Sequence, residues 1–95
     1  MNVQNLITLL ADVKKNAHVF FEIGINKILG ITSLKYDHTH CVNLLTKNTA
    51  NGLKVWELVI LLQKLPNDTL IYVLDHQKSH QIFGLRFDDG KVYLK

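Results

Sequence analysis

The chain has 95 residues, which is enough for one domain with a single core and a modest margin of stability. Its hydrophobic fraction of 47% and charged fraction of 20% are those of an ordinary globular protein and exclude an intrinsically disordered chain. The net charge of +3 comes from lysines spread along the sequence, with Arg86 as the single arginine, and this pattern favours a solvated surface over a nucleic-acid-binding face.

The sequence carries no feature of a membrane or secreted protein. No apolar run approaches the roughly 20 residues that a membrane helix needs, and the first residues lack the basic region of a secretory signal. The only cysteine, Cys41, excludes an internal disulfide and suits a reducing compartment. We therefore expect a cytoplasmic protein that does not bind membranes.

Taken in chain order, the predicted elements form the series helix, strand, strand, strand, and they do so twice. Asn2 is a suitable N-cap for a first helix, in which apolar residues recur at helical spacing as far as Val13. A second helix begins at Val55 and is stopped by Pro66. The pair Asp89-Gly90 predicts a tight hairpin. Segments rich in β-branched and aromatic residues predict strands at 18–23, 27–36, 41–46, 70–74, 81–87 and 91–94.

An internal repeat accounts for this double series. With a shift of 52 residues the two halves match at apolar positions, among them Val3 and Val55, Leu6 and Leu58, and Leu10 and Leu62. A two-residue gap then places Gly30 on Gly84. We therefore predict a single α+β domain over 1–95 that consists of two αβββ copies, 1–46 and 53–95, joined by the linker 47–52. The two copies would share one antiparallel sheet with pseudo-twofold symmetry, with both helices on one face.

The second helix carries a sequence pattern that resembles a known group of proteins. The run V-W-E-L-V-I-L-L-Q-K-L-P-N-D at 55–68 is similar to the V-x-E-L-I-x-x-L-x-x-L-P-x-D helix of small uncharacterised phage and prophage proteins, in which three strands follow. The resemblance covers 53–95, whereas the first copy matches only in its apolar positions. It implies a phage-type accessory protein of low-GC bacteria, acting in the host cytoplasm, and such proteins often bind a host or defence component.

The strongest candidate site is a docking surface on the second helix. Trp56 and Ile60, four residues apart, point away from the helix stripe that is expected in the core, and Leu61 adds to the same surface from its other flank. The matching positions of the first helix, Gln4 and Thr8, are polar. This asymmetry predicts a contact for the second helix, either inside the domain, with a second copy in a homodimer, or with a host protein.

The histidine-rich segments are a weaker candidate for a metal-dependent site. His38, His40 and Cys41 lie in one predicted hairpin, and His76 and His80 lie in another. A polar hairpin explains these residues better, because structural zinc sites usually use several cysteines. The carboxylates Asp75, Asp88 and Asp89 occupy turn positions, which favours turn formation over Mg²⁺ binding.

Arg86, Lys35 and Tyr36 are the residues that a nucleic-acid-binding or nucleotide-binding domain would use. Glycine-rich phosphate loops and the common hydrolase and metalloprotease motifs are absent from the sequence. We therefore expect a non-enzymatic protein without a cofactor that binds and inhibits or sequesters a host protein. A small nucleic-acid-binding or nucleotide-binding domain and a metal-dependent enzyme are the alternatives.

Overall fold

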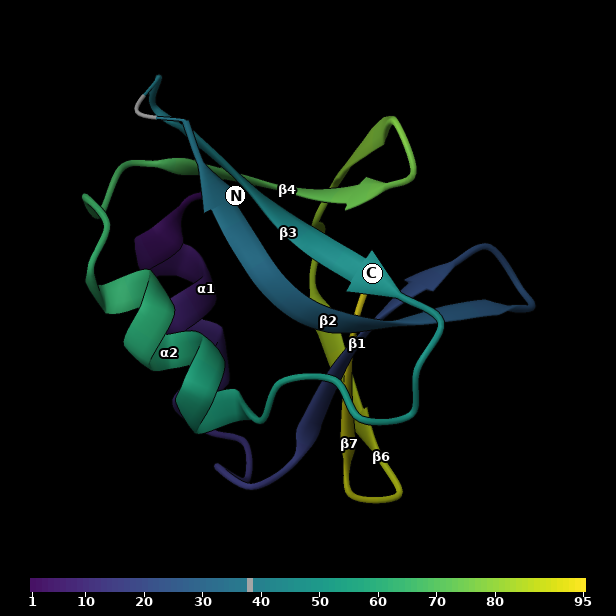
Figure 1. The fold of residues 1–95 in the computed structure, drawn as a ribbon. Helices are drawn as coiled ribbons and strands as arrows, with labels where there is room; N and C mark the ends of the chain where they lie inside the picture. Colours follow the sequence, from purple (N-terminus) through teal and green to yellow (C-terminus); the bar gives the residue numbers. More distant parts are fainter. Residues whose placement is uncertain (38) are drawn as a thin grey trace.

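The computed structural model describes residues 1–37 and 39–95, so the predicted metal ligand His38 lies outside the described residues. Both helices lie on the same side of a curled sheet (Figure 1). In chain order the elements are α1 (Val3–Leu10), β1 (His18–Ile23), β2 (Lys27–Tyr36), β3 (Cys41–Lys47), α2 (Val55–Gln63), β4 (Leu70–Asp75), β5 (Lys78–Gln81), β6 (Leu85–Asp88) and β7 (Lys91–Leu94). The α+β class expected from the sequence is confirmed.

The sheet is mixed, so the predicted antiparallel sheet is wrong. Its strands follow the order β5-β4-β3-β2-β1-β7-β6, and the pairs β3–β4 and β1–β7 are parallel. Parallel neighbours need a long crossover, and the linker and α2 supply it between the end of β3 and the start of β4. The apolar pattern of a strand shows which face is buried, but it does not show the direction of the neighbouring strand.

The predicted strand at 81–87 is broken in two. β5 pairs with β4, β6 pairs with β7, and residues Ile82 to Gly84 separate them. Ile82 is only 2% exposed and joins the core, while Phe83 is 82% exposed. The chain leaves the strand conformation between Ile82 and Gly84, where backbone pairing passes from β4 to β7. Likewise, β2 pairs with β1 through its first residues and with β3 through its later ones.

The strand registers also correct the predicted match between two glycines. Phe20 lies opposite Gly30 in the β1–β2 pair, and Tyr72 lies opposite Gln81 in the β4–β5 pair. At the 52-residue shift predicted from the sequence, which places Phe20 on Tyr72, the residues opposite these two are Gly30 and Gln81, not Gly30 and Gly84. Gly84 lies three residues further along the chain, in the break between β5 and β6.

The first turn of each helix is fixed by local hydrogen bonds. The Asn2 side chain accepts a bond from the Asn5 backbone N–H (2.8 Å), and the Asn5 side chain accepts one from the Asn2 N–H (3.0 Å). This capping box confirms Asn2 as the N-cap of α1. In α2, the Glu57 carboxylate accepts a bond from the Lys54 N–H (3.0 Å).

Each helix start is tied to the strand that begins the other half of the chain. The Val3 N–H donates to the Thr69 carbonyl (2.9 Å), which directly precedes β4. The Val55 N–H donates to the Ala17 carbonyl (2.9 Å), which directly precedes β1. The two bonds are related by the 52-residue shift, which places Val3 on Val55 and Ala17 on Thr69.

The linker between β3 and α2 is packed closely against the sheet. The Leu53 N–H donates to the Ile31 carbonyl (2.6 Å), which draws the linker onto β2. A Cβ atom on Gly30 would lie 2.8 Å from the Thr49 side chain, and one on Gly52 would lie 3.1 Å from the Ile31 carbonyl oxygen. Glycine is therefore needed on both sides of this contact.

The hydrophobic core lies between the helices and the inner face of the sheet. The helices contribute Val3, Leu6, Leu10, Val55, Leu58 and Leu62, and the strands contribute mainly valine, isoleucine and leucine side chains, such as Val19, Ile31, Leu44, Ile71, Val73 and Leu94. All of these side chains are almost fully buried. Among the described residues, neither helix has the length and apolarity required to cross a membrane.

Candidate docking groove between the two helices

An apolar groove of about 360 Å³ lies between α1 and α2. We call it the docking groove. Its walls come from both helices and from the chain that follows α1, and α1 and α2 lie side by side in Figure 1. The lining residues are Ile7, Leu10, Ala11, Lys15, Val55, Trp56, Val59, Ile60 and Gln63.

Trp56 and Ile60, predicted from their helical spacing, stand at this groove and remain 44% and 46% exposed. The core stripe of the same helix, represented by Leu58 and Leu62, is completely buried. Trp56 and Ile60 are therefore the large apolar side chains of the groove that keep almost half of their surface in contact with water. The Trp56 backbone N–H donates to the Lys15 carbonyl (3.1 Å), which fixes the first turn of α2 against the segment after α1.

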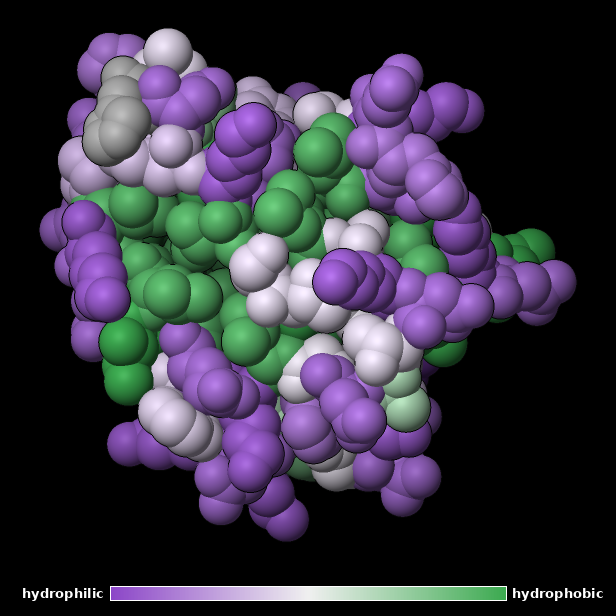
Figure 2. Space-filling model, in the orientation of Figure 1, coloured by the Kyte–Doolittle hydropathy of each residue, from purple (hydrophilic) through white to green (hydrophobic). Residues whose placement is uncertain are grey.

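The matching positions on α1 are polar and interact with each other. The Gln4 side-chain amide donates to the Thr8 hydroxyl at 3.2 Å, and both residues are exposed. Leu61, the third residue predicted for the surface, is half-buried and does not line the groove. Figure 2 shows hydrophobic surface over the part of the molecule where α2 lies in Figure 1, extending towards the strands in front of it.

Two groove residues on the α1 side, Ala11 and Lys15, were not predicted from the sequence. Both lie at or beyond the end of α1, where helical spacing no longer indicates which way a side chain points. The only sequence signal was the group of charged residues Asp12, Lys14 and Lys15 after Leu10, which a helix end explains equally well. Ala11 and Lys15 line the groove only because α1 packs against α2.

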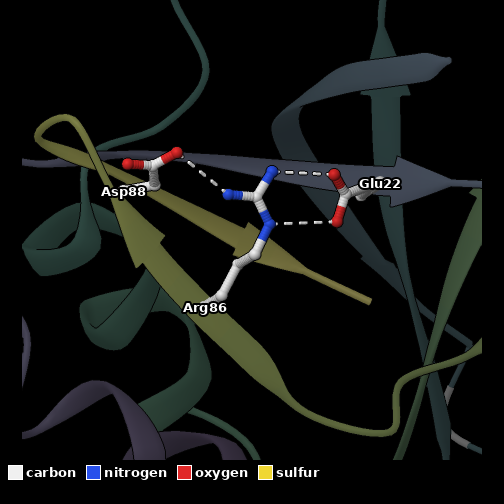
Figure 3. A network of polar contacts seen from close by, with 3 residues as sticks. All are labelled: Glu22, Arg86 and Asp88. Atoms are coloured by element: carbon white, nitrogen blue, oxygen red, sulfur yellow. Dashed lines mark hydrogen bonds and ion pairs between the residues drawn. The ribbon is translucent and has the colours of Figure 1, made fainter. Parts of the chain in front are cut away.

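Arg86, predicted as a nucleic-acid contact, is instead held by acidic side chains (Figure 3). Its Nε and Nη2 atoms donate to the two oxygens of Glu22 on β1 at 3.2 and 2.8 Å, and Nη1 donates to Asp88 at 3.3 Å. The guanidinium carbon also lies 4.1 Å from the centre of the Tyr93 ring. Hydrogen bonding from Arg86 lowers the pKa of Glu22 from its ordinary value, and Glu22 in turn raises the pKa of Arg86.

This arrangement disfavours phosphate binding by Arg86, because Nε, Nη1 and Nη2 each already donate to a carboxylate. The other two residues predicted for such a contact, Lys35 and Tyr36, lie on β2. In the sheet order, β1 and β7 separate that strand from β6. Lys35 is exposed and Tyr36 is half-buried. The structure therefore does not gather the three predicted residues in one site.

The two histidine-rich hairpins lie at opposite ends of the parallel pair β3–β4. His40 directly precedes β3 and His76 directly follows β4, so strand rise separates them by roughly 20 Å. His80 lies on β5, with its ring 5.6 Å from that of Phe21. The described residues contain no group of three or more histidine, cysteine, aspartate or glutamate side chains placed to hold a metal ion.

Asp75, weighed as a Mg²⁺ ligand, forms an ion pair with Lys27 at 2.9 Å and is 7% exposed. The hydrogen bond from Lys27 lowers the pKa of the Asp75 carboxyl from its ordinary value. The other two candidate ligands lie at the β6–β7 turn. There Asp89 and Gly90 both adopt positive φ angles, 51° and 74°, as a two-residue hairpin loop of type I′ requires.

Comparison with protein-family models, with curated proteins and with solved structures finds no match to this chain.

Proposed function

We propose that the protein is a non-enzymatic, phage-type accessory protein that binds a host protein in the docking groove and so inhibits or sequesters it. One observation carries this proposal. The groove is lined mainly by apolar side chains from both helices, and two large apolar side chains at it, Trp56 and Ile60, remain about half exposed. Tryptophan is enriched among the residues that dominate protein–protein binding energies.

The energetics suit a partner that fills the groove. Complete burial of one large apolar side chain contributes about 1.5–3 kcal/mol, so covering the exposed halves of Trp56 and Ile60 contributes roughly 2 kcal/mol together. Micromolar affinity needs about 8 kcal/mol. The partner must therefore also contact the groove floor, as an amphipathic helix does when it lies between two helices.

The proposal includes the internal repeat, in which two αβββ copies are related by a pseudo-twofold axis. Its support is the pair of bonds from Val3 to Thr69 and from Val55 to Ala17, which the 52-residue shift interconverts. The parallel pairs β1–β7 and β3–β4 are related in the same way, because each joins the first strand of one copy to the last strand of the other. On this account, α2 carries apolar Trp56 and Ile60 where α1 carries polar Gln4 and Thr8. Partner binding explains this difference between the two copies.

The test replaces the two apolar residues with those that α1 carries at the matching positions. The variant is Trp56→Gln/Ile60→Thr, and the control is Gln4→Ala/Thr8→Ala on the other helix. Each tagged protein is used to capture partners from a low-GC bacterial lysate, and folding is checked by circular dichroism.

We expect the wild type and the control to capture the same host protein, and the groove variant to lose it while remaining folded. Equal capture by all three proteins would contradict the proposal. Unfolding of the groove variant would also contradict it, because that result would assign Trp56 and Ile60 to the core.

A further inference from the structure

The docking groove carries a positive charge at one end. Among the described residues that line it, Lys15 is the single charged one, and the others are apolar apart from Gln63. Lys15 lies beyond the end of α1, and its carbonyl accepts the bond from the Trp56 N–H in the first turn of α2. Gln63 is the last residue of α2, so the two polar lining residues lie at opposite ends of that helix. The groove therefore combines apolar walls with one cationic end.

The structure contains an equivalent position that carries no cation. At the start of α1 the Gln4 N–H donates to the Asn67 carbonyl (3.1 Å), as the Trp56 N–H donates to the Lys15 carbonyl (3.1 Å) at the start of α2. The 52-residue shift relates the two bonds, so Asn67 lies beside α1 where Lys15 lies beside α2. A neutral residue supports the same backbone bond, and the helix start therefore does not require the charge of Lys15.

No acidic side chain in the described part of the chain forms an ion pair with Lys15. The two acidic residues closest in sequence to the groove residues are placed elsewhere. Asp12 lines a separate hollow together with Phe87, and the Glu57 carboxylate accepts the bond from the Lys54 N–H. Lys15 is exposed, so its ammonium group is available to a carboxylate from another molecule.

The groove has the length of about two helical turns. From Trp56 to Gln63 the axis of α2 rises by roughly 10 Å. Both walls are helices, whose backbone groups are largely bonded within each helix, so an extended peptide would find few backbone partners here. A helix satisfies its own backbone groups and presents apolar side chains at i, i+3, i+4 and i+7, which covers two turns. A carboxylate at the end of this apolar stripe would meet Lys15.

We infer that the docking groove takes an amphipathic helix of a host protein, and that an aspartate or glutamate at the end of its apolar stripe pairs with Lys15. This assignment rests on the function proposed above and adds the chemistry of the partner segment. A second copy of this chain cannot supply the helix, because the apolar stripes of α1 and α2 are already buried in its core. Charge complementarity contributes mainly to specificity, so Lys15 selects among the amphipathic helices of the host.

The test is a selection of helical peptides from a displayed library against the full chain. Each peptide has about 16 residues, with leucine at i, i+3, i+4 and i+7 and random residues at the other positions. Fluorescence polarisation then measures the selected peptides against two folded variants. Lys15→Asn introduces the residue of the equivalent position, and Lys14→Asn is the matched control, because it makes the same charge change one residue away from the groove lining.

We expect the selected peptides to be enriched in aspartate or glutamate at one end of the leucine stripe. They should bind Lys15→Asn about fivefold more weakly than the wild type, and Lys14→Asn within about twofold of it. Replacing the acidic residue of the peptide by lysine should weaken binding to the wild type and restore binding to Lys15→Glu. Selected peptides without an acidic preference would overturn the inference, and so would equal weakening by Lys15→Asn and Lys14→Asn, which indicates a diffuse charge effect.

The variant Trp56→Gln/Ile60→Thr separates this inference from the proposed function. If it loses peptides that show no acidic preference, the groove binds helices and only the pairing with Lys15 is wrong. If it binds the selected peptides as tightly as the wild type does, the peptides do not use the groove, and both the inference and the proposed function are contradicted. A library that yields no binder to the wild type contradicts both as well.

Discussion

The close passage of the linker against the sheet at Gly52 predicts a large effect from one methyl group. Gly52 is buried where the linker passes the sheet, and a Cβ atom there would collide with the Val19 carbonyl oxygen. It would also lie 3.1 Å from the oxygen and 3.2 Å from the nitrogen of Ile31. All three atoms belong to the backbone of strands, so no side-chain rotation can relieve the overlap. Gly52→Ala must displace the linker.

The cost can be estimated from what that displacement breaks. Overpacking costs about 1–3 kcal/mol in typical cores. The bonds from the Leu53 N–H to Ile31 and from the Val19 N–H to Leu53 are adjacent, and each contributes about 1 kcal/mol. We expect Gly52→Ala to lower the free energy of unfolding by about 3 kcal/mol, which for a domain of this size lowers Tm by roughly 15 °C.

Gly84→Ala is the matched control, because no atom lies within 4 Å of its Cβ position and its backbone φ is not positive. It should be neutral or stabilising by up to about 1 kcal/mol, through the lower entropy of the unfolded chain. Urea unfolding followed by circular dichroism measures both variants. Equal stability of Gly52→Ala and Gly84→Ala would refute the close passage of the linker against β1 and β2.

Three further predictions concern stability. Leu62→Ala, at a completely buried position of α2, should cost about 2–5 kcal/mol in urea unfolding, and a cost below about 1 kcal/mol would contradict its place in the core. Gly90→Ala, at a φ of 74°, should cost about 1 kcal/mol, and an unchanged Tm would argue against the type I′ turn. Because Lys27 lowers the pKa of Asp75, the ionised carboxylate favours the folded state, and its contribution is present at neutral pH and lost as the pH falls below about 4. Asp75→Asn should therefore be less stable than the wild type at neutral pH, and its stability should depend less on pH in this acidic range. Identical thermal melting curves for the two proteins from neutral to acidic pH would count against this account.

The features that the sequence predicted well are those determined by residues close to one another in the sequence. Asn2 caps α1 because its side chain reaches an N–H three residues away, and Asp89 and Gly90 form a tight turn because both tolerate a positive φ. Helical spacing likewise placed Trp56 and Ile60 away from the core stripe of α2. None of these features depends on how distant parts of the chain meet.

The features that could not be predicted depend on which strands become neighbours. Apolar alternation is the same in parallel and antiparallel pairs, so the direction of β4 beside β3 could not be read from it. The match of Gly30 with Gly84 rested on local similarity, whereas the register makes Gln81 the counterpart of Gly30.

The most direct test of the docking groove is site-specific photo-crosslinking in a low-GC bacterial lysate. One variant carries Ile60→p-benzoylphenylalanine at the groove, and the matched control variant carries Thr8→p-benzoylphenylalanine at the corresponding position of α1. We predict an adduct between the chain and a second, different protein from position 60, and no such adduct from position 8. Equal adducts from both positions, or an adduct that contains only two copies of this chain, would contradict the proposal that the groove binds a host protein.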